Sequence, residues 1–437
     1  MSEGFSLQPY IDRLAHIDTT PPHGRVVRTV GLLIESTGPR VSVGSMCQVL
    51  GQSGAESLPV QVVGFRDSIV LSVPLGDTVG VRVGDRIVAR AGALSVGVGE
   101  SMLGRVIDAL GRPLDGGPPI RAAEHYPLHP PPLNPMARDP VSQPLPTGVR
   151  AIDGMLTCGR GQRIGLFGGS GVGKSTLMGM LTRGTAADVI VLALVGERGR
   201  EVRGFIEHDL GDEGLRRSVV VVSTSDNPPL LRLRAAYTAT TVAEYFRDKG
   251  LNVLLLMDSV TRFAMAQREV GLAAGEPPTT KGYPPSVFAL LPTLLERAGA
   301  VRNRGSITAM YTVLVDGDDH NEPIADAVRS ILDGHIVLSR DLASRSHYPP
   351  IDILQSVSRT MPDVTEAEHR QSAARVRGWM AAIRDSEDLV SVGAYVEGSN
   401  PRIDEARSKR EAIEAFLCQA SDTLSGFPDA VASLGAL

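Results

Sequence analysis

The chain has 437 residues, of which 42% are hydrophobic and 21% charged, and its net charge is −5. This length exceeds one compact core and favours a globular protein of two or three domains. The acidic balance argues against a general nucleic-acid binder, and three widely spaced cysteines without a CxxC pattern argue against a zinc site. No run reaches the length of a membrane span and no secretory signal opens the chain. We therefore expect a cytoplasmic protein, with peripheral membrane contact left open.

The N-terminal part is predicted to contain a helical arm and a β-barrel. Residues 1–20 place Leu7, Leu14 and Ile17 on one helical face, which suits either packing on its own domain or binding of a partner. Residues 21–95 contain short β-type runs separated by glycines, which predict a small barrel with a structural or assembly role. The runs are Arg25–Glu35, Gly44–Leu50, Leu58–Phe65, Ser68–Val73 and Asp85–Arg90.

Residues 96–147 are interpreted as a connecting segment. Glycines punctuate its first half, and its second half is dense in proline, including Pro130, Pro131 and Pro132. Proline cannot donate hydrogen bonds to a strand ladder and favours extended backbone, so we expect this stretch to follow a surface.

Residues 148–362 alternate buried β-type runs with helical segments such as 230–249 and 259–273. Runs without polar alternation indicate strands covered on both faces, which predicts an α/β nucleotide-binding core with a mostly parallel sheet. The charged, alanine-rich residues 363–437 predict a small C-terminal helical domain. The predicted core strands are Arg163–Phe167, Asp188–Val195, Ser218–Ser223, Asn252–Met257, Ser306–Val315 and His335–Leu338.

A glycine-rich turn follows the first of these strands and fits G-x-x-x-x-G-K-[ST] from Gly168 to Ser175. Such a turn directs backbone N–H groups and a helix N-terminus at the phosphates of a nucleotide. Lys174 is expected to reach the β- and γ-phosphates of ATP and Ser175 to hold Mg²⁺. The cradle itself is predicted to be Gly168, Gly169, Ser170, Gly171, Val172, Gly173, Lys174, Ser175 and Thr176.

Two acidic residues follow other predicted strands, and parallel strands bring their carboxyl ends to one side of a sheet. Asp258 ends an apolar run and is expected to hold Mg²⁺ through water, with capping of the next helix as the alternative. Glu197 is expected to position the water that attacks the γ-phosphate. The alternative for Glu197 is a structural ion-pair cluster with Arg198, Glu201 and Arg203.

These motifs closely resemble those of the type III protein-export ATPases, which include the flagellar and the injectisome enzymes and are relatives of the catalytic subunits of rotary ATP synthases. The resemblance covers about residues 24–400 as an ordered set. Besides the phosphate loop, it is carried by the segments 196–202, 254–264, 275–288, 317–319, 331–340, 347–352 and 356–359.

The resemblance implies an N-terminal β-barrel, a RecA-like ATPase core and a C-terminal helical domain, assembled as a ring of six copies. It implies that Glu197 is the catalytic glutamate and that Arg198 and Arg262 surround the γ-phosphate. Tyr348 resembles the aromatic residue that stacks on adenine, and Arg359 the arginine finger that reaches the neighbouring subunit's site. Because Glu197 and Arg359 lie in one chain, a homomeric ring could build an active site at every interface.

The resemblance also implies partners. We expect a negative regulator or stator protein at the N-terminal arm, chaperone–substrate complexes, a stalk protein and a membrane export gate, with the ring peripheral at the cytoplasmic face of the inner membrane. The segments 26–49 and 391–404 look closer to the flagellar branch than to the injectisome branch. A rotary synthase subunit and a Rho-type nucleic-acid motor are the further alternatives, and the few aromatic residues near the N-terminus disfavour nucleic-acid binding.

Overall fold

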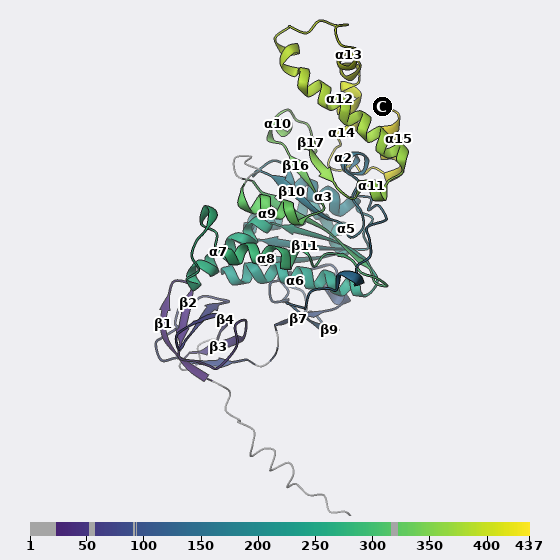
Figure 1. Cartoon of the computed structure of the whole chain (residues 1–437). Coiled ribbons are helices and arrows are strands. Elements are labelled where there is room, and N and C mark those ends of the chain that lie inside the picture. The colour runs from purple at the N-terminus through teal and green to yellow at the C-terminus, as the bar shows by residue number, and fades with distance from the viewer. Residues whose placement is uncertain (1–22, 52–56, 91, 93, 316–321) are drawn as a thin grey trace, which may run out of the picture. The chain divides into compact units, whose positions relative to one another are not determined.

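A computed structural model describes residues 23–51, 57–90, 92, 94–315 and 322–437 (Figure 1). The predicted arm over residues 1–20 lies outside these residues. The chain divides into two compact units, one containing the chain up to Leu94 together with Leu272–Glu276, and one containing Ser95–Gly271 and Pro277–Leu437.

The first unit is a closed barrel of six strands in the order β1-β2-β5-β4-β3-β6. The single run predicted over residues 25–35 is a hairpin instead, because Gly31 adopts a φ of +56° and turns the chain between β1 and β2. Alternate side chains such as Val26, Ile34 and Val60 fill the interior. The strands are β1 (His23–Val30), β2 (Leu33–Ser36), β3 (Met46–Leu50), β4 (Leu58–Arg66), β5 (Ile69–Pro74) and β6 (Arg86–Ala89).

The second unit is built on a nine-stranded sheet, ordered β17-β16-β10-β15-β13-β11-β12-β8, with β14 paired to β15. Neighbours in this order are parallel except β16 and β17, which are antiparallel. The strands are β8 (Arg105–Asp108), β10 (Arg163–Gly168), β11 (Val189–Val195), β12 (Ser218–Ser223), β13 (Asn252–Asp258), β14 (Gly299–Ala300), β15 (Ser306–Leu314), β16 (Gly334–Leu338) and β17 (Ile351–Ser358). A separate two-stranded sheet pairs β7 (Ser95–Val98) with β9 (Glu124–Pro127).

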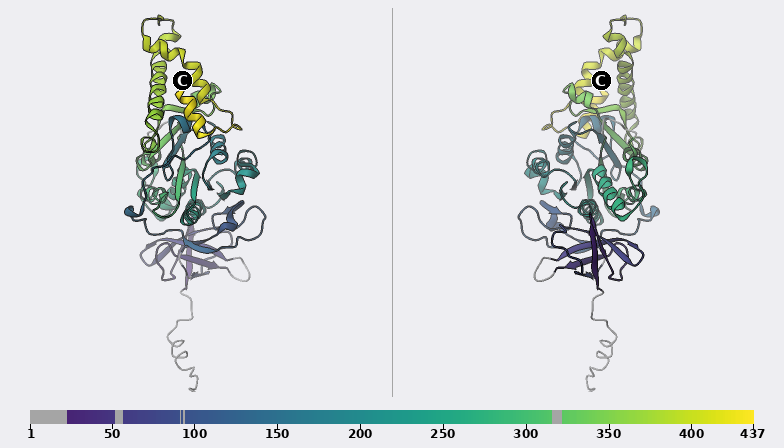
Figure 2. Two further views of the ribbon diagram at one scale, coloured as in Figure 1. Left: turned by 90° about the vertical axis from the view of Figure 1, so that its right-hand side faces the viewer. Right: turned by 90° about the vertical axis from the view of Figure 1, so that its left-hand side faces the viewer.

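Helices cover both faces of this sheet, so β11 and β12 are buried along their whole length (Figure 2). The long helices are α3 (Lys174–Gly184), α6 (Pro229–Asp248), α7 (Val260–Ala274), α8 (Pro285–Leu295), α9 (Pro323–Ile331) and α12 (Ala367–Ser391). The C-terminal group also contains α13 (Pro401–Ser408), α14 (Arg410–Leu417) and α15 (Phe427–Gly435). Shorter turns are η1 (Glu100–Met102), η2 (Pro135–Ala137), α2 (Arg150–Met155), α4 (Gly199–Gly204), η3 (Phe205–Leu210), α5 (Gly211–Arg216), η4 (Thr280–Gly282), α10 (Arg340–Ser344) and α11 (Met361–Val364).

The structure adds three strands to the sheet that the sequence patterns did not indicate, namely β8, β17 and the two-residue β14. β8 lies inside the stretch interpreted as a connector and forms one border of the sheet beside β12. β17 forms the other border and runs against the remaining strands. No helix in the described part of the chain combines the length and apolarity that crossing a bilayer requires.

The two opposite ends of the parallel strands carry different residues. At the carboxyl end of the sheet, β10, β11 and β13 finish at Gly168, Val195 and Asp258. At the amino end, where β10 and β16 begin, the antiparallel β17 finishes beside Gly334. Residues that follow β17 therefore lie at the amino end.

Candidate active site

The phosphate loop joins β10 to α3 at the carboxyl end of the sheet. Gly171 and Gly173 adopt φ values of +78° and +94°, a region that residues with a side chain rarely enter. The first residue of α3 is Lys174, and the N–H of Leu177 donates to the carbonyl of Gly173 over 3.1 Å. The loop therefore has the strand–turn–helix context that a phosphate-binding sequence requires.

A pocket of about 420 Å³ opens above this loop, a size suited to a small ligand. Most of the predicted site residues line it: Gly169, Ser170, Gly171, Gly173, Lys174, Ser175, Thr176, Glu197, Arg198, Asp258 and Arg262. Gly168 and Val172 do not. Val172 is 2% exposed, and a Cβ on Gly168 would lie 3.0 Å from the Val172 side chain, so both support the loop from the core.

Lys174 lies between the two predicted carboxylates. Its Nζ is 2.6 Å from Oδ1 of Asp258 and 4.0 Å from Oε1 of Glu197. The Asp258 side chain is only 6% exposed, and its Oδ1 also accepts a hydrogen bond of 2.7 Å from the hydroxyl of Thr312. Lys174 thus contacts both acids, and Arg262 adds a weaker electrostatic effect that favours the charged form of Glu197.

The environment of Glu197 disfavours its charged form. Burial first, and then the negative charge of Asp258, raise the pKa of Glu197 from 4.5 to about 7, although Lys174 lowers it. A carboxylate with a pKa near neutrality is suited to exchange a proton with water during hydrolysis. The perturbed group lies in the same pocket as the phosphate loop, which marks a functional site.

The two arginines of the pocket differ in how they are held. Arg262 packs its aliphatic stem on Gly196, where a Cβ would lie 3.0 Å from the Cβ of Arg262, and its buried Nε makes no hydrogen bond with the described residues. Arg198 is 66% exposed and pairs loosely with Glu201 at 3.3 Å. Both guanidinium groups therefore have donors to offer an anionic ligand.

Tyr348 and Arg359 lie outside this pocket. Tyr348 is half-exposed beside the loop, with its Cε1 3.7 Å from the position that a Cβ on Gly173 would occupy. Arg359 follows β17 at the amino end of the sheet, and its exposed side chain has no hydrogen bond or ion pair with the described residues. Within one chain, Arg359 is thus on the side of the sheet remote from Lys174.

Sequence reasoning missed Thr312, whose hydroxyl donates to Asp258 from β15. Glu201, which the sequence placed only in the alternative ion-pair cluster around Glu197, lines the pocket from α4, pairs with Arg198 and helps to raise the pKa of Glu197. Thr312 has no local signal, because it lies within an apolar run. Only the pairing of β13 with β15, in register at Met257 and Tyr311, brings Thr312 to Asp258.

Comparison with known proteins gives the same class of site. The nucleotide-binding domain of the ATP synthase alpha/beta family matches residues 148–358, and the C-terminal domain of the T3SS EscN ATPase matches residues 365–436. The chain belongs to the ATP synthase alpha/beta family, in its branch of flagellum-specific ATP synthases and type III secretion ATPases.

Individual relatives match nearly full length. The flagellum-specific ATP synthase of Bacillus subtilis is 52% identical and covers 98% of each chain, and that of Pseudomonas aeruginosa is 54% identical over 95% of this chain and 92% of its own. The type 3 secretion system ATPase of Sinorhizobium fredii is 50% identical over 98% and 96%. The assembled ATPase EscN of enteropathogenic E. coli superposes with a TM-score of 0.90 at 45% identity, covering 94% of this chain and 98% of that one.

Proposed function

We propose that this chain hydrolyses Mg·ATP to energise protein export through a flagellar type III system, at active sites that are completed between neighbouring subunits of a homomeric ring. The observation that carries the proposal is the placement of Lys174, Asp258 and Glu197 in one pocket over the phosphate loop. Arg359, by contrast, lies at the other end of the same sheet.

Each residue of the pocket has a separate proposed role in hydrolysis. The loop N–H groups and Lys174 bind the β- and γ-phosphates, and Tyr348 stacks on the adenine. Glu197 accepts a proton from the attacking water and orients it toward the γ-phosphate. Arg198 and Arg262 stabilise the charge that develops on the phosphoryl oxygens.

The donor set fits a magnesium ion bound together with the nucleotide. The described residues contain no group of three or more His, Cys, Asp or Glu side chains placed to hold a metal by themselves. Mg²⁺ characteristically takes one or two protein oxygens and completes its shell with water and phosphate. Ser175 and Asp258 would supply those oxygens, and the bound ion would neutralise phosphate charge.

Arg359 is proposed to act in a neighbouring subunit, because its own pocket lies at the opposite end of the sheet. The solved relative EscN is described as an assembled ATPase, and another structure holds it with its central stalk EscO. By analogy we propose a ring of six copies with a stalk protein, docking of chaperone–substrate complexes and of a membrane export gate, and a negative regulator at residues 1–20. The ring would be cytoplasmic and peripheral at the inner membrane.

Mixed rings test the proposed interface. Glu197→Gln and Arg359→Ala should each abolish most hydrolysis alone, because an arginine finger contributes about 10³- to 10⁵-fold in rate. When the two variants are mixed in equal amounts, about a quarter of randomly formed head-to-tail interfaces regain one intact glutamate and one intact arginine. Recovery of ATPase activity on mixing supports catalysis between subunits. Two inactive variants that stay inactive in verified mixed rings would exclude it.

The type of export system is tested in cells that lack this chain. Flagellum-specific and injectisome relatives differ by only a few per cent in identity to it. We expect deletion to stop motility and the secretion of flagellar filament protein, with restoration by the wild-type chain but not by Glu197→Gln. Loss of effector secretion with normal motility would assign the injectisome instead. ATPase stimulation by RNA but not by export substrates would favour a nucleic-acid motor.

A further inference from the structure

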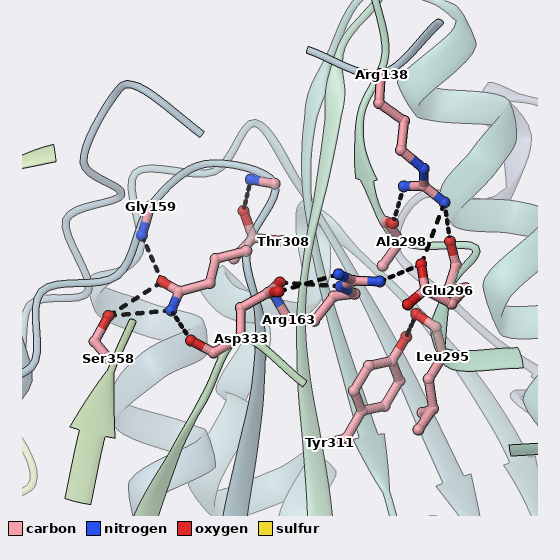
Figure 3. Close-up of polar contacts among 12 residues, drawn as sticks. Arg138, Gly159, Arg163, Leu295, Glu296, Ala298, Thr308, Tyr311, Asp333 and Ser358 are labelled. Carbon is pink, nitrogen blue, oxygen red and sulfur yellow. Dashed lines mark hydrogen bonds and ion pairs between the residues drawn. The ribbon is translucent and has the colours of Figure 1, made fainter. Parts of the chain in front are cut away.

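A partly buried polar network occupies the amino end of the sheet (Figure 3), and one of its members, Asp333, accepts a backbone hydrogen bond from Arg359. Its centre is a forked ion pair in which the Nε and Nη2 of Arg163 each lie 3.0 Å from a carboxylate oxygen of Asp333. The backbone N–H of Arg163 also donates to the Asp333 carboxylate over 3.1 Å. Two parallel bonds to a planar guanidinium fix the orientation of an acid more tightly than a single contact does.

The same residue contacts the backbone of Arg359. The carbonyl of Asp333 accepts the N–H of Arg359 at 3.0 Å and the side-chain amide of Gln162 at 3.1 Å. Gln162 is fully buried, and its amide also donates to the hydroxyl of Ser358 at 3.0 Å. The hydroxyl of Ser358 in turn donates to the carbonyl of Thr157 over 2.8 Å.

The backbone on both sides of Arg359 is therefore held from the neighbouring strand. Gly334 lets β17 approach closely, because a Cβ there would lie 2.5 Å from the carbonyl oxygen of Val357. By contrast, the guanidinium of Arg359 has no partner among the described residues. The direction in which this long side chain leaves the protein is thus determined at its backbone.

Open space adjoins the network at the end of β17. A cavity of about 610 Å³ borders the network, lined among others by Arg163, Asp333 and Thr360. An Asp333 side chain released from Arg163 can turn into this space. A displacement of about 1 Å in a reacting group can cost on the order of 10²-fold in rate.

We propose that Asp333, held by Arg163 and Gln162, is a positioning residue that fixes the backbone of Arg359 for transition-state stabilisation in the neighbouring subunit. This inference rests on the proposed role of Arg359 as the arginine finger. It adds that the position of this arginine is set by residues at the amino end of the sheet that do not contact the nucleotide. Glu296 and Arg138 extend the network away from Arg359, since Glu296 pairs with Arg163 and with Arg138.

The chain contains a matched control for this ion pair. Arg105 and Asp115 form a second fork, with Nε–Oδ2 and Nη2–Oδ1 distances of 2.7 and 2.8 Å, and Asp115 also accepts a backbone N–H, from Val106. The carboxylates are similarly exposed, at 23% for Asp115 and 29% for Asp333. Asp115 follows β8, at the opposite border of the sheet from β17.

The test compares Asp333→Asn with Asp115→Asn in assembled rings of the full chain. Both should lose similar thermal stability and keep wild-type affinity for a fluorescent ATP analogue. Only Asp333→Asn should lower kcat, by roughly 10- to 100-fold with KM unchanged. In an Arg359→Ala background, Asp333→Asn should lower kcat no further, because residues that act through one group are not additive.

The outcomes distinguish the positioning role of Asp333 from the role of Arg359 as the arginine finger. The positioning role is overturned if Asp333→Asn lowers kcat in the Arg359→Ala background by as much as it does alone. It is also overturned if Asp333→Asn and Asp115→Asn have equal kcat values. Neither result contradicts the role of Arg359 as the arginine finger. Full activity of Arg359→Ala overturns the finger, and the positioning role with it. If Asp333→Asn fails to assemble, Arg163→Lys against Arg105→Lys repeats the comparison, because lysine keeps the charge but loses the fork.

Discussion

Each end of the central sheet places one basic residue next to two carboxylates, but the two ends differ in how these groups are paired. At the carboxyl end, Lys174 faces Asp258 and Glu197, the pKa of Glu197 is raised to about 7, and the Nε of Arg262 is buried without a partner. At the amino end, Arg163 also faces two carboxylates: Asp333 accepts hydrogen bonds from its Nε and Nη2, and Glu296 forms an ion pair with its Nη1, which makes no hydrogen bond with the described residues. Burial opposes the charge of Arg163, yet those two acids raise its pKa overall.

The two clusters differ in how their charges are arranged. At the carboxyl end two acids share the contact with Lys174, and the pKa of Glu197 is raised. At the amino end one guanidinium is held between two acids, which resists rearrangement and can hold a backbone in one place. The strand β10 connects the two clusters, because it begins at Arg163 and ends at Gly168, the first residue of the phosphate loop.

The largest expected effect comes from Lys174→Ala. Removal of the one cation between Asp258 and Glu197 should lower kcat by on the order of 10³-fold or more, since the phosphate oxygens lose their main electrostatic partner. It should also weaken ATP binding and raise the pKa of Glu197 further. Steady-state kinetics and titration with a fluorescent nucleotide measure both effects. A far-UV circular dichroism spectrum like that of the wild type is the control for folding.

Glu197→Gln should lower kcat and raise the thermal stability of the fold. Loss of the proton acceptor lowers kcat by about 10²- to 10⁴-fold. A carboxyl group with a raised pKa destabilises the fold progressively as the pH rises from 4.5 to about 7, because the unfolded chain releases this proton over that range while the native state still holds it, and above about pH 7 the penalty is constant. The amide removes this penalty, so Tm at pH 8 should exceed that of the wild type by a few degrees. A Tm equal to or below that of the wild type would contradict the raised pKa of Glu197.

The pH profile gives a smaller effect with a defined sign. Because the free enzyme must hold Glu197 deprotonated to accept a proton, kcat/KM should fall roughly tenfold per pH unit below about pH 7. Glu201→Gln should move this acidic limb to lower pH, since Glu201 contributes to the raised pKa. An acidic limb that stays near pH 4.5 in the wild type would assign the proton transfer to another group.

Much of the carboxyl end could be predicted from local sequence patterns. Glu197 and Asp258 each follow a continuous apolar run, and parallel strands must bring such positions to one side of a sheet. Lys174 is defined by its spacing from Gly168 and Gly173. These signals are contained within short windows, so no knowledge of strand order was needed.

The amino end could not be predicted in this way. Arg163 and Asp333 are far apart in the chain, and their pairing depends on β16 lying beside β10, whereas the approach of Arg359 to Asp333 depends on β17 running antiparallel to β16. β8 was missed for a related reason, since a four-residue strand among glycines and prolines has too short an apolar pattern to detect. Thr312 likewise reaches Asp258 only through strand register.

The smallest expected effect comes from Glu296→Gln, which tests whether Glu296 contributes to the position of Arg359. Glu296 is 48% exposed, and its backbone carbonyl, which accepts from Arg138, survives substitution. Glu296→Gln should therefore change the free energy of unfolding by no more than about 1 kcal/mol and leave kcat unchanged, because Asp333 keeps its fork with Arg163. Thermal unfolding and steady-state kinetics beside Asp333→Asn measure this contrast. A loss of kcat as large as that of Asp333→Asn would mean that the position of Arg359 depends on the whole chain of charges from Arg138 to Asp333.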